Sequence, residues 1–182
     1  KDEFDQDKLS NPYSDSKFLS GEKDKKVKRI LVGIDIGTEE VLLAKELERM
    51  GKPIDLIIAH HPQGKALADL HEVMDLQTSV LAQAGIPENI AEGIIREQLE
   101  DVSRKISPIN HYKSVMAAEL LGFSMINVHT PADNCVWKFV DDLLKNKNPR
   151  RISYIIDLLK TIPEYNEAVK LGSGPKIFSG KE

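Results

Sequence analysis

The sequence is short of cysteine, of aromatic residues and of long apolar runs, and these shortages exclude several classes of protein. A single cysteine, Cys135, excludes an intramolecular disulfide and any zinc site made of several cysteines. No apolar run approaches the ~18 residues of a membrane-spanning helix, so we expect no membrane partner. Aromatic residues make up 5% of the 182 residues and hydrophobic residues 41%, a composition typical of a globular protein.

The sequence also lacks an excess of positive charge. It contains 25 Lys and Arg residues against 29 Asp and Glu residues, which gives a formal net charge of −4. Domains that hold nucleic acid through bulk charge usually carry a clear basic excess, so a nucleic-acid partner is not expected. Together with the single cysteine, this composition predicts a protein of a reducing compartment, the cytoplasm.

The composition changes along the chain and predicts three regions. Residues 1–26 are too rich in charge to build a core alone, so we predict an irregular charged arm there. An α/β domain is expected over 27–172, and a Gly/Ser-rich tail over 173–182. The chain begins with Lys1 and ends just after a possible strand at 175–178. We therefore expect the tail to lead into a continuation of a longer protein.

Three short apolar segments predict buried strands, and the intervening sequence is helical in its periodicity. The predicted strands cover 29–35, 54–60 and 123–129. A helix that begins at Thr38 would join the first two, and such a βαβ unit makes its strands parallel. Residues 69–122 predict helices almost throughout, and further helices are expected after Thr130 and over 151–171. The predicted fold class is α/β, with three layers in which helices sandwich a mostly parallel sheet, and with a helical insertion between strands two and three.

The turn after the first predicted strand has two interpretations. Its sequence, Gly33 to Thr38, resembles the D-x-G-T phosphate-binding turn of the actin, chaperone and sugar-kinase superfamily, in which the turn joins two strands. The alternative is an ordinary strand-to-helix turn that needs glycine for its backbone. A helix after Thr38 would favour the second interpretation. The sequence has neither a G-x-x-x-x-G-K-[ST] loop nor a G-x-G-x-x-G motif, so no nucleotide cofactor is predicted.

Histidines follow two of the three predicted strands. His60 and His61 end the second strand and are followed by Pro62, while His129 ends the third strand and is followed by Asp133. Because ligands of open α/β sheets bind at the carboxyl ends of the strands, these four side chains are expected at one edge of the sheet. Neutral imidazole and ionised carboxylate are the forms that bind divalent transition metals. The pattern suits two neighbouring metals, or one metal and one polar partner.

Two of these motifs resemble a known family. The segments IDLIIAHHP (54–62) and VHTPAD (128–133) are similar to the two N-terminal metal-binding motifs of the Nif-three-like family, and RILVGIDIGTEEVLLA (29–44) is similar to its first strand and helix. These proteins are dinuclear-metal proteins that form hexameric rings and are often described as homologues of GTP cyclohydrolase I type two. The resemblance covers about 28–60 and 123–145. It implies that His60, His61, His129 and Asp133 are ligands of two adjacent metal ions, and it implies a homo-oligomer.

The resemblance also implies ligands that the sequence does not supply. The family completes its site with an H-x-x-x-E pair near the C-terminus, and no such pair occurs in this sequence. Either the missing pair lies in a continuation of the chain, or other residues replace it. His71 and Asp75 share a helix face at i, i+4 and are candidates for replacement ligands; a solvated cluster at a helix start is the alternative.

The sequence therefore predicts a protein with a dinuclear metal centre. The leading hypothesis is a metal-dependent hydrolase that resembles GTP cyclohydrolase I type two, and the alternative is a non-catalytic metal-binding protein with a regulatory or interaction role. The metal would be zinc, iron, manganese or nickel, because mixtures of His and Asp accept all four. No residue is assigned as a general base, and the substrate is not defined by the sequence.

Overall fold

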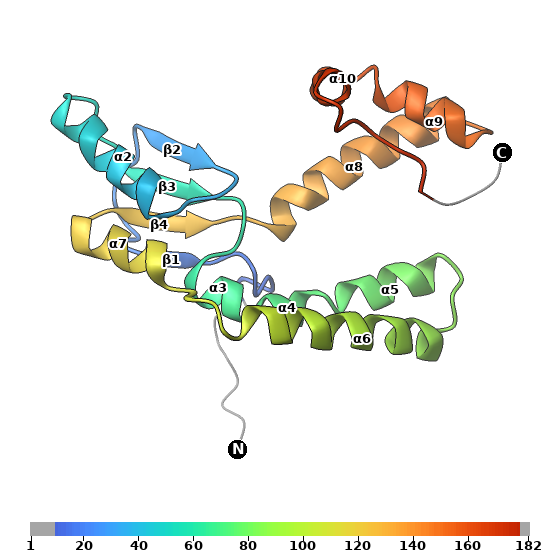
Figure 1. The fold of residues 1–182 in the computed structure, drawn as a ribbon, viewed down its shortest axis with the longest axis horizontal. Helices are drawn as coiled ribbons and strands as arrows, with labels where there is room; N and C mark the ends of the chain where they lie inside the picture. Colours follow the sequence, from blue (N-terminus) through green and yellow to red (C-terminus); the bar gives the residue numbers. More distant parts are fainter. Residues whose placement is uncertain (1–9, 179–182) are drawn as a thin grey trace. The chain divides into compact units, whose positions relative to one another are not determined.

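The computed structural model of the chain describes residues 10–178, and it contains one four-stranded sheet and a series of helices (Figure 1). The strands are β1 (Phe18–Ser20), β2 (Ile30–Gly33), β3 (Leu56–Ala59) and β4 (Ser124–Asn127). The helices are α2 (Thr38–Arg49), α3 (Gly64–Ala68), α4 (Leu70–Val73), α5 (Leu76–Gln83), α6 (Glu88–Ile106), α7 (Lys113–Leu121), α8 (Thr130–Lys147), α9 (Ile152–Leu159) and α10 (Pro163–Lys170). The chain divides into two compact units, with the boundary between Asp133 and Asn134.

The sheet of the first unit confirms the predicted fold class, an α/β fold with a mostly parallel sheet. Its strand order is β1-β4-β3-β2. β2 pairs with β3 in parallel, with Gly33 opposite Ala59, and β3 pairs with β4 in parallel, with Ala59 opposite Asn127. The three predicted strands are β2, β3 and β4, and the predicted helical insertion comprises α3 to α7 between β3 and β4.

One part of the predicted arm is not irregular. Phe18–Ser20 forms β1, which pairs antiparallel with β4 at the edge of the sheet. The pairing continues one residue outside the strand, because Lys17 N donates to Asn127 O at 3.2 Å and Asn127 N donates to Lys17 O at 3.0 Å. A short segment of this charged arm can become a strand here because β4 supplies its hydrogen-bond partners, so the segment needs no core of its own. Residues 1–9 of the predicted arm lie outside the described residues.

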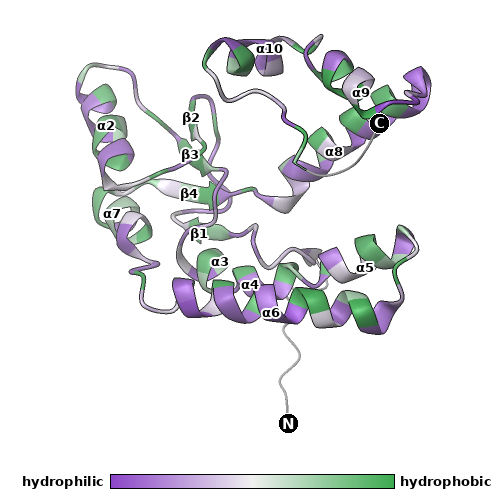
Figure 2. Ribbon diagram, turned by 45° about the vertical axis from the view of Figure 1, so that its right-hand side comes forward, coloured by the Kyte–Doolittle hydropathy of each residue, from purple (hydrophilic) through white to green (hydrophobic). Residues whose placement is uncertain are grey.

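The core lies between the sheet and two helices that cover one of its faces. Ile57 of β3 and Met125 of β4 are fully buried, together with Val41 and Ala44 of α2. Val115 and Ala118 of α7 complete the same cluster. Figure 2 shows hydrophobic segments on the strands and on parts of α2 and α7. Ile30 and Val32 of β2 alternate onto the other face, where their side chains are 48% and 59% exposed.

The second unit consists of helices. It contains α8 from Asn134 onward, α9 and α10, and so the helical region predicted over 151–171 is present as two helices. Residues 175–178, a possible strand from the sequence, form no regular structure. A strand requires a partner to accept its backbone hydrogen bonds, and no strand occurs among the described residues of this unit. The predicted domain boundaries, between residues 26 and 27 and between residues 172 and 173, stay a prediction.

No helix among residues 10–178 is long and apolar enough to cross a membrane.

The core position of Ile57 gives a prediction for stability. Replacing Ile57 by Ala leaves a cavity between the sheet and α2, and we expect the free energy of unfolding to fall by ~2–5 kcal/mol. Ile30→Ala on the exposed face removes the same atoms without a cavity and should have a clearly smaller effect. Urea denaturation followed by circular dichroism measures both; equal losses in the two variants would contradict this description of the core.

Asp55 gives a prediction for pH dependence. Its carboxylate accepts hydrogen bonds from Arg29 N and Lys28 N, both at 2.9 Å, and these bonds lower the pKa of Asp55. A carboxyl whose pKa is lower in the folded state stabilises the fold above its ordinary value of about 4. That contribution is lost as the pH falls through the folded-state pKa. We expect the stability of Asp55→Asn to depend less on pH in the acid range than that of the wild type. Asp24→Asn, at an exposed position, should keep the pH dependence of the wild type. Thermal melts between pH 2 and 7 measure this; parallel curves for wild type and Asp55→Asn would contradict it.

Candidate metal centre

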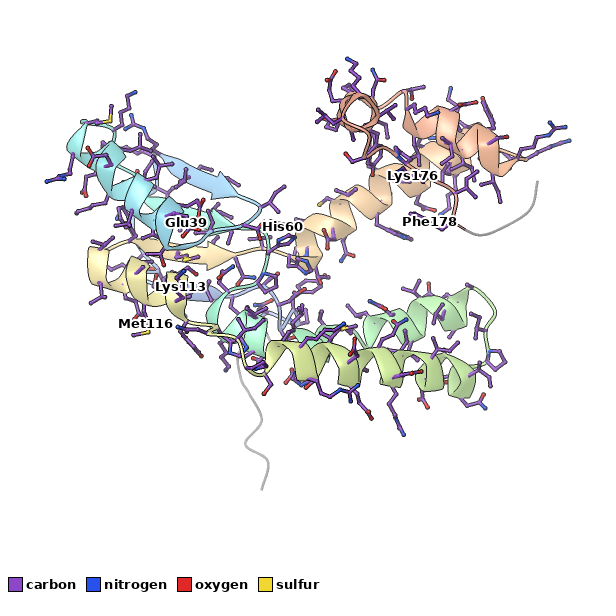
Figure 3. The ribbon with its side chains drawn as sticks, viewed as in Figure 1. Glu39, His60, Lys113, Met116, Lys176 and Phe178 are labelled. Carbon is purple, nitrogen blue, oxygen red and sulfur yellow. The ribbon has the colours of Figure 1, made fainter. Side chains whose placement is uncertain are left out.

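The candidate site lies at the carboxyl ends of β3 and β4. His60 follows β3 directly, and His129 lies two residues after the end of β4. The sheet hydrogen bonds continue into this region, because His60 N donates to Gly33 O and Val128 N donates to Ala59 O, both at 2.9 Å. The parallel register therefore places both histidines at the same edge of the sheet, as the sequence predicts. Figure 3 labels His60 at the point where the chain leaves β3.

Three histidine rings gather at this edge. The ring centroid of His60 lies 4.9 Å from that of His129 and 5.2 Å from that of His61. The centroids of His61 and His129 are 6.1 Å apart. Three imidazoles are thus close enough together to act on the same ion or on adjacent ions, and neutral imidazole is the form that binds metals.

The hydrogen bond of His60 fixes which of its nitrogens is free. Its Nδ1 lies 3.1 Å from the backbone oxygen of Val128. A carbonyl oxygen only accepts, so Nδ1 carries the proton and Nε2 keeps its lone pair. That Nε2 lies 3.4 Å from Oδ1 of Asp133. His60 is thus oriented by the backbone of the neighbouring strand to present a ligand atom to Asp133.

His129 has the same arrangement with a carboxylate in place of the carbonyl. Its Nδ1 lies 2.9 Å from Oδ2 of Asp15, and its Nε2 lies 3.7 Å from Oδ2 of Asp133. Thr130 N also donates to Oδ2 of Asp15, at 3.3 Å, which identifies that oxygen as an acceptor. His129 therefore donates from Nδ1, and its Nε2 is free on the side of Asp133.

Asp133 supplies the carboxylate between the two free nitrogens. It lies in the first turn of α8, where the positive end of the helix favours an ionised carboxylate. The turn is closed by hydrogen bonds from Ala132 N and Asp133 N to His129 O, at 2.9 and 3.0 Å. This local turn brings residue 133 back over the ring of residue 129, as the spacing of the H-T-x-x-D motif predicts.

These three residues form a group able to hold a metal ion. One ligand atom from each of His60, His129 and Asp133 lies within 4.8 Å of the other two. Two imidazole nitrogens and one carboxylate oxygen are a ligand set that divalent transition metals accept. Three protein ligands leave coordination positions open, which is the usual arrangement of a catalytic rather than a structural zinc site.

His61, the fourth predicted ligand, lies beside this group and has a different partner. Its Nδ1 lies 2.7 Å from Oδ1 of Asp35 in the turn after β2. Its backbone N donates to Ile34 O at 2.8 Å, which holds residue 61 next to that turn. The side chains of His61 and Asp35 are 48% and 82% exposed. The contact with Asp35 uses Nδ1 of His61 and does not involve its Nε2.

The turn that contains Asp35 is a strand-to-helix turn. α2 begins at Thr38, so the interpretation as an actin-like phosphate-binding hairpin is wrong. The backbone N–H of Gly37 donates to Oε2 of Glu40 at 2.7 Å. A carboxylate of the chain itself thus occupies the N-terminal end of α2, a place where anions such as phosphate can bind.

The other histidines lie outside the group of three. His71 contacts Ala68 O through Nδ1 at 3.2 Å, and with Asp75 it lines a separate pocket beside Pro12 and Leu99. Among the described residues, neither joins the group formed by His60, His129 and Asp133. His111 contacts Ile106 O through Nε2 at 3.0 Å at the end of α6.

Asp15 is the residue of this site that the sequence does not reveal. It lies in the predicted irregular arm, its side chain is fully buried, and it contacts His129 across 114 positions of sequence. The available signal is faint: Phe18 and Leu19 form a very short apolar run that ends before the turn at Gly21. Recognising β1 there would have placed the preceding Asp15 near the end of β4.

Fold and site together define an α/β protein with two imidazoles and a carboxylate arranged for a divalent cation. Among solved structures, the chain is similar to a NIF3 superfamily protein from Sphaerobacter thermophilus, with a TM-score of 0.72 and 29% sequence identity. The match covers 85% of this chain and 56% of that one, so the chain spans little more than half the length of the solved protein. No protein-family model and no curated protein matches the sequence. The structural match confirms the predicted resemblance to the Nif-three-like family.

The two hydrogen-bonded rings give a prediction for the metal-free protein. In the neutral form of the ring, we expect the proton of His60 on Nδ1, since that atom faces Val128 O. His111 is the matched control, because its Nε2 faces a carbonyl and should carry the proton instead. Long-range ¹H–¹⁵N correlation spectra distinguish the two tautomers. The same tautomer for both residues would contradict this assignment of the ring nitrogens.

Proposed function

We propose that this chain carries the metal-binding part of a metal-dependent hydrolase of the cyclohydrolase type, with a dinuclear centre. The observation that supports the proposal most directly is that one ligand atom each of His60, His129 and Asp133 lies within 4.8 Å of the other two. The similarity to a NIF3 superfamily structure is consistent with it. The ion would be zinc, iron, manganese or nickel, since the donor set contains nitrogen and oxygen only.

The first ion of the centre would be held by His60, His129 and Asp133. The two imidazoles are oriented before any ion binds, because Val128 O and Asp15 hold their Nδ1 atoms at 3.1 and 2.9 Å. A divalent ion in such a site lowers the pKa of a bound water and polarises the bond under attack. Asp133 is 55% exposed, so the ligand set faces the side from which a substrate can approach.

His61 would contribute to a second, adjacent ion. Its ring centroid lies 5.2 Å from that of His60, and its Nδ1 is occupied by Asp35. In this proposal its Nε2 is the ligand atom, in parallel with His60 and His129. The remaining ligands would come from a C-terminal H-x-x-x-E pair, as the family resemblance implies, and the same resemblance implies assembly into a homo-oligomeric ring.

A non-catalytic metal-binding role is the second candidate, and one observation favours it. Every described carboxylate that pairs with these rings is in contact with one or two of the histidines. Asp15 contacts His129, Asp35 contacts His61, and Asp133 contacts both His60 and His129. Among residues 10–178, no further carboxylate pairs with these rings and is left to act as a general base. A protein of this kind would bind the metal and use it for structure or for an interaction.

Metal binding tests the shared part of both candidates. We expect purified protein to bind Zn²⁺, and we expect His60→Ala and Asp133→Ala to raise its dissociation constant by more than the ~10–100-fold that the loss of a residue behind the ligands causes. His71→Ala removes an imidazole outside the group and should bind like the wild type. Competition with a chromophoric chelator measures the constants. Unchanged binding in both His60→Ala and Asp133→Ala would refute the site.

Two further measurements distinguish the candidates. In the full-length protein, two zinc ions per chain, reduced to one in His61→Ala, would support the dinuclear centre, while one ion in the full-length wild type would contradict it. Metal-loaded full-length protein should open the ring of GTP or a related substrate, or hydrolyse a phosphoester, if it is a hydrolase. No turnover with any of these compounds in the loaded protein would favour the non-catalytic role.

A further inference from the structure

The side chain of Asp15 is fully buried, and its two carboxylate oxygens accept several hydrogen bonds. Oδ2 accepts hydrogen bonds from Thr130 Oγ1 at 2.5 Å, His129 Nδ1 at 2.9 Å and Thr130 N at 3.3 Å. Oδ1 accepts from Ser16 Oγ at 3.2 Å. A buried carboxylate without such donors would be strongly unfavourable. The surroundings are therefore built to hold a carboxylate at this place, directly behind His129.

We infer, on the basis of the proposed metal site, that Asp15 is the positioning residue of His129 and that metal binding is coupled to the docking of residues 15–20. A carboxylate that accepts a hydrogen bond from Nδ1 of a metal-binding histidine fixes the ring orientation and raises the basicity of the other nitrogen. The free Nε2 of His129 points to Asp133 at 3.7 Å. Asp15 thus acts on the ion through His129 and need not touch it.

The backbone around Asp15 extends this effect to the whole segment. Asn127 Nδ2 donates to the backbone oxygen of Asp15, and His129 N donates to Ser16 Oγ at 2.9 Å. β1 then pairs with β4, with Phe18 opposite Ile126. The stretch of chain that delivers His129 from β4 is therefore held on one side by residues 15–20. If this segment detaches, His129 loses both its ring partner and its backbone partner.

Thermodynamic linkage makes this coupling reciprocal. If docking of residues 15–20 orients His129 and so strengthens metal binding, then metal binding must stabilise the docked segment by the same free energy. Asp35 and His61 provide the contrast within the same site. Their contact is exposed to water, with the side chain of Asp35 82% exposed, and exposed contacts of this kind contribute little free energy.

The first test compares Zn²⁺ binding by the wild type, Asp15→Asn and Asp69→Asn. Asp15→Asn keeps the shape of the side chain and removes the carboxylate. We expect this variant to bind Zn²⁺ more weakly, with a dissociation constant about 10–100-fold higher than that of the wild type. We also expect the neutral ring of His129 to shift toward the Nε2–H tautomer in ¹H–¹⁵N spectra, a change that a merely structural role would not produce. Asp69 pairs with Lys17 of the same segment at 3.8 Å without reaching the site, so Asp69→Asn should stay within about twofold of the wild type.

The second test needs no variant and applies if Asp15→Asn does not fold. Hydrogen exchange of the wild type should slow at residues 15–20 when Zn²⁺ is added, while α6 at 88–106 should exchange at the same rate. Folded Asp15→Asn with wild-type affinity for Zn²⁺, or Zn²⁺ binding without slower exchange at 15–20, would overturn the inference and leave the proposed site intact. If His60→Ala bound Zn²⁺ as tightly as the wild type does, both the inference about Asp15 and the proposed metal site would be overturned.

Discussion

The parallel pairing of β3 with β4 is the constraint on which the site depends. Ala59 lies opposite Asn127 at the last pair of the ladder, and the next residues along each strand deliver His60 and His129 to the same edge. A shift of one residue in this register would turn each side chain to the other face of the sheet. Ile57 and Met125, both fully buried, fix the register through the core. The geometry of the candidate ligands is thus set by apolar packing several residues away from them.

The polar partners of the histidines then set which nitrogen each ring presents. His60 uses the backbone oxygen of Val128, which is part of the sheet edge itself, whereas His129 uses the carboxylate of Asp15 from a separate segment. The first partner is a backbone group of a residue whose own N–H is bonded to Ala59 O of β3. The second partner depends on a three-residue edge strand. The two ligands of one site therefore differ in how firmly they are held, and this difference gives the N-terminal segment its influence over the site.

Local sequence carries much of this arrangement but not its long-range parts. The strands and the predicted ligands could be recognised because apolar runs end in histidine, and because the turn from His129 to Asp133 needs only four residues. Strand β1 and the role of Asp15 could not, since pairing with β4 joins positions more than 100 residues apart, as in Lys17 with Asn127. The pairing of His61 with Asp35 is likewise a contact between two turns. Such contacts follow from topology, which periodicity along a single segment does not contain.

The donor set itself indicates how strongly this chain would hold an ion. Structural zinc sites have four protein ligands, whereas sites that react with a substrate keep a position open. Here, the three residues that converge are His60, His129 and Asp133, and Asp133 remains more than half exposed. A set of this kind gains affinity chiefly by having its ligands oriented in advance, because each ring that is already fixed loses less freedom when the ion binds. The hydrogen bonds from Nδ1 of His60 and His129 provide that orientation, and the charge of Asp15 strengthens one of them. The residues behind the candidate ligands thus add to the affinity of an open site, while the ligands themselves determine its chemistry.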